Sequence, residues 1–219
     1  MNIQTNYLEV KKTARYVTYG NLSEKTQYFW LAVHGSNMLC EQMIYKFKEF
    51  DPETHFVVAP EALSRFYAKK FGGDVLAAWM TSRDRLKEID DLAAYLNQLY
   101  TLYTKQLSAD CKKTILSFSQ GGTITYRWLH RLSVEADYLL AYSCWIPEDI
   151  DLKLSVTNLN ELTTIYTYGI QDQFLTEKRI KVVQEIIQRN DLKIKMEAYE
   201  GDHRVSKVQL KAIFEKYIC

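Results

Sequence analysis

Ser119 is the residue of this sequence whose neighbours point most clearly to chemistry. It lies inside the hexapeptide SFSQGG, which follows the apolar residues 114–116 and precedes a helix-like stretch at 123–132. A strand, a tight turn with a serine, and then a helix form a nucleophile elbow, in which the hydroxyl stands exposed above a helix N-terminus. The pattern predicts a nucleophilic serine. A glycine-rich turn without chemistry is the alternative, because Ser117 replaces the first glycine of the usual motif.

A nucleophilic serine needs a base to take its proton and a carboxylate to orient that base. In doubly wound hydrolases these groups occur in the order serine, acid, histidine, each just after a strand. Asp172 follows the apolar run 163–168, and His203 follows the alternating run 193–199. We therefore predict a triad of Ser119, Asp172 and His203. Asp202 is the alternative acid, but side chains of neighbouring loop residues usually diverge, which favours Asp172.

The other three histidines are weaker candidates for the base. His55 starts a predicted strand and His130 lies inside a predicted helix, so both are expected to be packing or surface residues. His34 ends the predicted strand 29–33 and precedes a glycine. Such a turn presents a backbone amide rather than a base, which leaves His203.

Two backbone N–H groups are expected to stabilise the oxyanion. The first is the amide of Gln120, the residue after the nucleophile. The second comes from the loop after His34 and Gly35, where we expect the amide of Ser36 and keep Asn37 as the alternative. His34 and Gly35 are therefore expected beside the substrate.

The elements that must position these residues alternate along the chain. Near-continuous apolar runs, typical of strands covered on both faces, occur at 29–33, 56–59, 114–118, 138–142 and 163–168. Helical patterns occupy 83–103, 123–132, 177–188 and 205–217, and a further edge strand is expected at 14–19. The alternation predicts an α/β fold with a mostly parallel central sheet flanked by helices. We expect one domain over residues 1–219, without a large lid domain.

Residues 60–80 form the longest stretch without a regular pattern. The stretch contains Phe66, Trp79 and several other aromatic or apolar side chains. Long irregular loops in compact domains are often functional. Phe66 and Trp79 are therefore candidates for the wall of a substrate pocket, and a surface cluster is the alternative.

The composition excludes several other classes of function. Hydrophobic residues make up 47% and charged residues 25%, and the formal net charge is +1, so no nucleic-acid partner is expected. No apolar run is long enough for a transmembrane helix, and the N-terminus lacks the features of a signal peptide. The four scattered cysteines predict free thiols in the cytoplasm rather than disulfides or a zinc site.

Three motifs together resemble one family. Residues 31–35 (LAVHG), 118–122 (FSQGG) and 143–147 (SCWIP) are similar to the oxyanion turn, the elbow and a pocket segment of the phospholipase/carboxylesterase family of α/β-hydrolases, which includes acyl-protein thioesterases. The resemblance implies the α/β-hydrolase fold and hydrolysis of small carboxylic esters or thioesters through an acyl-enzyme. It implies no metal or cofactor. Trp145 is then expected to form an apolar wall for the acyl chain.

The chain also departs from that family. Ser117 adds bulk at the elbow, and Cys144 stands where the family often has glycine. Residues 60–67 do not match the better-known esterases, so their substrate preference is not carried over. A thioesterase, an acyl transferase and a non-catalytic binding protein on the same scaffold remain alternatives to a carboxylesterase.

Overall fold

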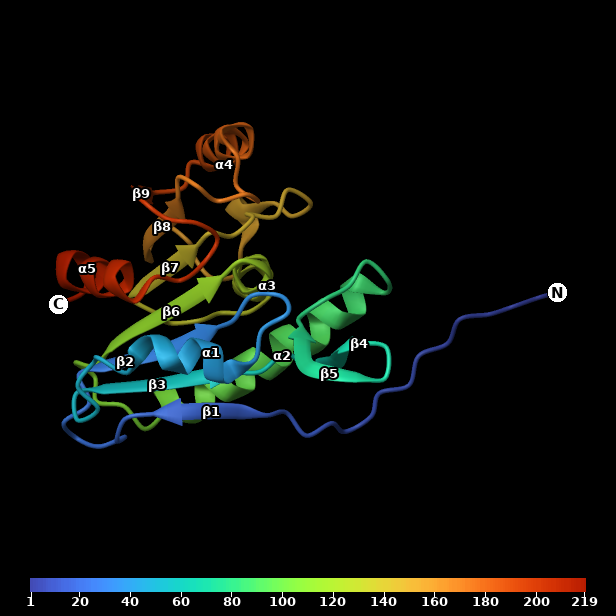
Figure 1. Ribbon diagram of the computed structural model, residues 1–219, viewed down its shortest axis with the longest axis horizontal. Coiled ribbons are helices and arrows are strands. Elements are labelled where there is room, and N and C mark those ends of the chain that lie inside the picture. The colour runs from blue at the N-terminus through green and yellow to red at the C-terminus, as the bar shows by residue number, and fades with distance from the viewer.

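A seven-stranded sheet runs through the centre of the computed structural model, which describes residues 1–219 (Figure 1). Its strands are β1 (Tyr16–Tyr19), β2 (Tyr28–Val33), β3 (His55–Pro60), β6 (Lys112–Phe118), β7 (Tyr138–Tyr142), β8 (Thr163–Gly169) and β9 (Ile194–Tyr199). The spatial order is β1-β3-β2-β6-β7-β8-β9, and every neighbouring pair is parallel except β1 with β3. The prediction of a mostly parallel sheet with an antiparallel edge strand is confirmed.

Helices cover both faces of this sheet (Figure 1). They are α1 (Cys40–Ile44), α2 (Arg85–Thr104), α3 (Gln120–Arg131), α4 (Glu177–Arg189) and α5 (Lys207–Tyr217), with short 3₁₀ turns at Tyr45–Phe47 and Leu152–Leu154. Successive side chains of a strand point to opposite faces. Leu31 of β2 therefore joins the core under α2, α3 and α4, whereas Trp30 joins the core under α1 and α5. None of the helices has the length and apolar character that crossing a membrane would require.

The expectation of an irregular segment at 60–80 is wrong. These residues form an antiparallel hairpin of β4 (Ser64–Lys69) and β5 (Gly72–Ala78), which is separate from the main sheet. All of β4 is exposed, and only the end of β5 is buried. Because the hairpin has no extended apolar face, its strands lack the pattern by which buried strands are identified.

Candidate active site

The predicted triad residues lie at one edge of the sheet, where several parallel strands end. Ser119 follows β6, Asp172 lies in the loop after β8, and His203 lies in the loop after β9. The carboxyl ends of parallel strands share one edge, so residues far apart in the sequence meet there. Open α/β sheets commonly bind their ligands in this position.

A continuous chain of hydrogen bonds joins the three side chains. The Nε2 atom of His203 lies 2.9 Å from Ser119 Oγ, and its Nδ1 atom lies 2.6 Å from Asp172 Oδ2. An ionised carboxylate can only accept, so Nδ1 carries the proton and Nε2 offers a lone pair to the hydroxyl. This is the tautomer that a base needs to remove the proton of Ser119.

The carboxylate of Asp172 is fixed by the loop that contains it. Its side chain is fully buried, and its second oxygen, Oδ1, accepts the backbone N–H groups of Phe174 at 2.8 Å and Leu175 at 3.1 Å. The alternative acid, Asp202, is bound by both nitrogens of an Arg204 fork instead. That hydrogen bonding lowers the pKa of Asp202. Of the two carboxylates, only that of Asp172 is hydrogen-bonded to the imidazole.

Two aromatic rings hold the imidazole of His203 in place. Its ring centroid lies 4.9 Å from that of Phe118 and 4.7 Å from that of Phe174, which meets it edge to face. Phe118 precedes Ser119, and Phe174 follows Asp172 by two positions. The strand that delivers the serine and the loop that delivers the acid therefore also restrain the histidine.

The backbone at Ser119 is strained, as expected for a sharp turn. Its φ is 52° and its ψ is −122°, a combination that non-glycine residues rarely adopt and that costs about 1–3 kcal/mol. The turn is closed tightly on β2, since a Cβ atom on Gly121 would lie 2.3 Å from the carbonyl oxygen of His34. Glycine at 121 is therefore required for the approach of the turn to the loop after β2.

Free amides are available where the oxyanion donors are expected. The backbone N–H groups of Gln120 and Ser36 donate to no other group of the protein. The amide of Asn37, the alternative to Ser36, donates to Ala77 O at 2.8 Å and is not free. The loop that carries Ser36 is close to the nucleophile, because a Cβ atom on Gly35 would lie 3.1 Å from Ser119 Cβ.

The side chain of Gln120 ties the hairpin to the nucleophile turn. Its Oε1 accepts the backbone N–H of Trp79 at 2.9 Å, and its Nε2 donates to the carbonyl of Met80 at 2.8 Å. The indole N–H of Trp79 in turn donates to His34 O at 2.7 Å. The end of the hairpin is thus bonded to both segments that supply the free amides.

His34 supports this loop from inside the core. Its ring is fully buried, Nε2 accepts the N–H of Ala62 at 3.0 Å, and Nδ1 lies 2.6 Å from Gly35 O. Both contacts are satisfied only when Nδ1 carries the proton and the ring is neutral. Burial lowers the pKa of His34, which favours the same neutral form.

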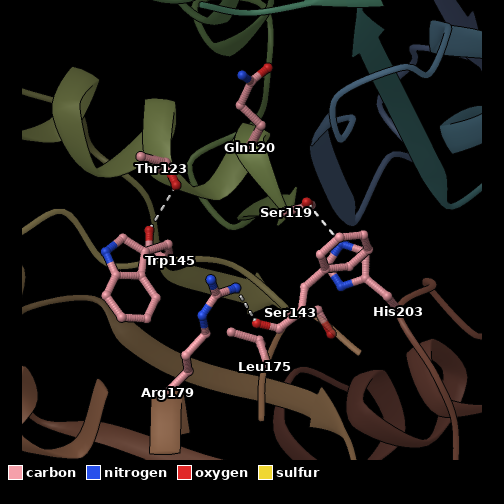
Figure 2. A pocket seen from close by; sticks show the side chains of 9 residues that line it. Ser119, Gln120, Thr123, Ser143, Trp145, Leu175, Arg179 and His203 are labelled. Atoms are coloured by element: carbon pink, nitrogen blue, oxygen red, sulfur yellow. Dashed lines mark hydrogen bonds between the residues drawn. The ribbon is translucent and has the colours of Figure 1, made fainter. Parts of the chain in front are cut away.

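A cleft with a volume of about 390 Å³ opens beside the hydrogen-bonded chain (Figure 2). Trp145, one of the residues predicted to line the pocket, is among its walls. The other residues predicted beside the substrate do not line it: His34, Gly35 and Trp79 are buried, and Phe66 lies on the exposed hairpin. The lining residues are Ser119, Gln120, Thr123, Ser143, Trp145, Phe174, Leu175, Arg179 and His203.

Four of these lining residues were not identified from the sequence: Thr123, Phe174, Leu175 and Arg179. Ser143, which belongs to the predicted pocket segment 143–147, follows the end of β7, and its buried hydroxyl has no hydrogen-bond partner. Phe174 and Leu175 are found by following the acid loop past Asp172. Arg179 lies in the first turn of an ordinary amphipathic helix and gives no signal in the sequence.

One cluster of potential metal ligands exists elsewhere. The ligand atoms of Cys40, Glu41 and Glu61 lie within 4.8 Å of one another. The guanidinium of Arg15 already occupies the middle of this cluster, with Nη1 2.8 Å from Cys40 Sγ and 2.9 Å from Glu61 Oε2. Burial raises the pKa of Cys40 to about 12, so the thiol keeps its proton. The cluster is an ion-pair network rather than a metal site.

Comparisons with known proteins found one matching family and several similar folds. A family described as phospholipase/carboxylesterase matches residues 36–218. Among solved structures, esterase PE8 is 16% identical, with a TM-score of 0.71 over 94% of this chain and all of that one. The acyl-protein thioesterase 2 of Zea mays is 16% identical, with a TM-score of 0.70 over 93% of this chain and 97% of that one. A phospholipase/carboxylesterase from Dyadobacter fermentans is 14% identical, with a TM-score of 0.69 over 95% and 98% of the two chains. No curated protein matches the sequence.

Proposed function

Since the chain belongs to the phospholipase/carboxylesterase family and has its α/β-hydrolase fold, we propose that it hydrolyses small carboxylic esters through an acyl-enzyme on Ser119. The observation that carries the proposal is the continuous hydrogen-bonded chain from Ser119 Oγ through His203 to Asp172. In this proposal residues 1–219 form one catalytic domain. The family resemblance alone does not assign the three roles, and the two hydrogen bonds support a different proposed role for each side chain.

In the first step, His203 Nε2 removes the proton from Ser119 Oγ as the oxygen attacks the ester carbonyl. Asp172 stabilises the imidazolium that forms and keeps the ring in the productive tautomer. The hydrogen bonds to Asp172 Oδ1 from two backbone amides hold the carboxylate still while this happens. His203 then gives its proton to the leaving alcohol, and in the second step it activates the water that releases the acid.

The developing oxyanion is held by the amides of Gln120 and Ser36, which have no other acceptor. Losing one such donor typically costs about 3 kcal/mol in the barrier. The Gln120 side chain positions one of these amides by its two bonds to the end of the hairpin. Trp145 provides the apolar wall against which the acyl chain packs.

Labelling by a fluorophosphonate probe tests the proposal directly, because the probe reacts only with an activated serine. We expect labelling of the wild type and none of Ser119→Ala. Ser117→Ala is the matched control, since this serine is close in sequence but fully buried, and it should still be labelled. Labelling of Ser119→Ala, or no labelling of a folded wild type, would contradict the proposal.

A panel of matched acyl esters and thioesters then separates the two subclasses of activity. We expect the ester of each pair to be hydrolysed by the wild type and not by Ser119→Ala. Faster turnover of every thioester would assign a thioesterase instead and leave the mechanism unchanged.

A further inference from the structure

Arg179 is the one positively charged lining residue of the cleft apart from the titratable His203, and no acidic side chain lines the cleft. It lies in the first turn of α4, just after the loop that carries the acid. In Figure 2 its side chain reaches toward the space beneath Ser119 and Trp145. The side chains that line the cleft therefore include a positive charge and no negative charge.

The guanidinium of Arg179 is held but not neutralised. Its Nη1 donates to the backbone carbonyl of Phe174 at 2.7 Å, which fixes the head group to the wall of the cleft. It forms no ion pair, whereas six other arginines each contact a carboxylate: Arg15, Arg65, Arg85, Arg127, Arg131 and Arg204. Its remaining N–H donors have no partner in the protein. An arginine that is fixed in place with free donors is suited to bind a planar or tetrahedral oxyanion.

Two neighbouring features add to this preference. The N-terminus of α4 has no side-chain cap, so its partial positive charge lies at the end of the helix that carries Arg179, together with the exposed carboxylate of Glu177. Ser143, whose exposed fraction is 2%, also lines the cleft, and its hydroxyl has no hydrogen-bond partner. The lining of the cleft thus offers hydrogen-bond donors, on Arg179 and Ser143, that the proposed hydrolysis by the triad does not use.

We propose that Arg179 binds an anionic group of the substrate, a carboxylate or a phosphate, and makes the site selective for esters that carry one. This inference rests on the proposed esterase function and names its substrate class. Arg179 acts in substrate binding, not in the chemistry of Ser119. The anion lies either on the acyl chain or on the alcohol, and the two arms of the experiment distinguish these sources.

In the first arm, rates are compared for 4-nitrophenyl monoesters of succinic, glutaric and adipic acid and for the neutral 4-nitrophenyl esters of butyric, valeric and hexanoic acid. In the second arm, the butyrate monoester of glycerol 3-phosphate is compared with glycerol monobutyrate. In one arm, we expect Arg179→Gln to lower the anionic-to-neutral ratio of kcat/KM about tenfold. This is the lower end of the effect for a hydrogen bond to a charged group, because the cleft is open to water. Arg179→Lys should restore part of the ratio.

Arg189→Gln is the matched control, because it makes the same change at the exposed far end of the same helix. Its ratio should equal that of the wild type. The ratio cancels any general effect of Arg179→Gln on the acid loop, since both esters of a pair need the same triad. An unchanged ratio in Arg179→Gln in both arms would overturn the inference.

A binding measurement keeps the inference testable even if the proposed hydrolysis is wrong. Trp145 is partly exposed in the cleft, whereas Trp30, Trp79 and Trp128 are buried, so its fluorescence reports on the site. With Ser119→Ala as host, monomethyl adipate should bind more tightly than methyl hexanoate, or glycerol 3-phosphate more tightly than glycerol. Adding Arg179→Gln should remove the difference. Equal binding of each pair to the host would refute anion recognition, whereas failed labelling at Ser119 would refute only the catalytic proposal.

Discussion

Gly122, in the first turn of α3, lies so close to Cys144 that no side chain fits at position 122 while Cys144 is present. A Cβ atom on Gly122 would lie 2.2 Å from Cys144 Cβ and 2.5 Å from its Sγ, where ordinary contact begins at 3.4 Å. Both sides are held: Gly122 N donates to Ser119 O at 3.0 Å, and Cys144 O accepts the hydroxyl of Tyr166 at 2.6 Å. A shift of more than 1 Å is therefore needed to relieve the overlap in Gly122→Ala.

We expect Gly122→Ala to lower the free energy of unfolding by about 3 kcal/mol, the upper end for overpacking in a core. Cys144→Gly alone should cost about 2 kcal/mol, from the lost buried side chain and the added backbone freedom. In the double variant the new methyl group fills the vacated space, so the total loss should also be about 2 kcal/mol instead of the additive 5 kcal/mol. The predicted coupling energy is thus about 3 kcal/mol.

Urea unfolding followed by circular dichroism measures these four proteins on one scale. Gly121→Ala is the matched control, because its Cβ would meet the backbone oxygens of His34 at 2.3 Å and Val33 at 2.9 Å, and no atom of Cys144 is among its three nearest neighbours. Cys144→Gly should not rescue it. The reasoning would be refuted if the losses of Gly122→Ala and Cys144→Gly added within about 0.5 kcal/mol in the double variant. It would also be refuted if Cys144→Gly rescued Gly121→Ala as much as it rescues Gly122→Ala.

Three further predictions concern the triad, a buried charge and pH. Asp172→Asn should lower kcat for ester hydrolysis by about 10⁴-fold with little change in fold, because the amide cannot stabilise the correct tautomer of the imidazole; steady-state kinetics and circular dichroism check it. Asp149→Ala should cost about 2–3 kcal/mol in urea unfolding because it strands the buried guanidinium of Arg127, whereas Arg85→Ala, which removes the exposed partner of the same carboxylate, should cost about 0.5 kcal/mol or less. Equal losses would contradict this. Burial lowers the pKa of His34 below its ordinary value of 6.5, so the unfolded chain binds a proton first and stability should fall as pH drops from about 6.5 toward the folded-state pKa; an NMR titration that puts the His34 pKa above 6.5 would reverse the sign.

Much of the fold could be predicted because the sheet is covered on both faces. Strands such as β7 are continuous apolar runs, and the polar residues that directly follow them stand out. Ser119, Asp172 and His203 were identified on this basis, and the structure brings their side chains into hydrogen-bonding contact.

The walls of the cleft could not be predicted in the same way. Trp79 was predicted as a wall because it lies in a long segment without a regular pattern, but its indole N–H donates to the carbonyl of His34 inside the core. Arg179 belongs to a helix surface, where arginine is common, and only the fold of the preceding loop turns it toward the cleft. A residue's contribution to a cleft depends on tertiary contacts, which residue spacing does not encode.

The position of β9 at the edge of the sheet has a consequence for how activity responds to stress. This strand pairs only with β8, it has no fully buried residue, and the loop that follows it carries His203. Edge elements with few buried contacts open locally at a lower free energy than the centre of a domain, where β6 holds the nucleophile. Catalysis would then be the first property lost on warming, while the fold itself persists, and it would return when the strand pairs again on cooling. The folded protein would thus have a reversible inactive state, in which β9 has separated from β8 and His203 has moved away from Ser119.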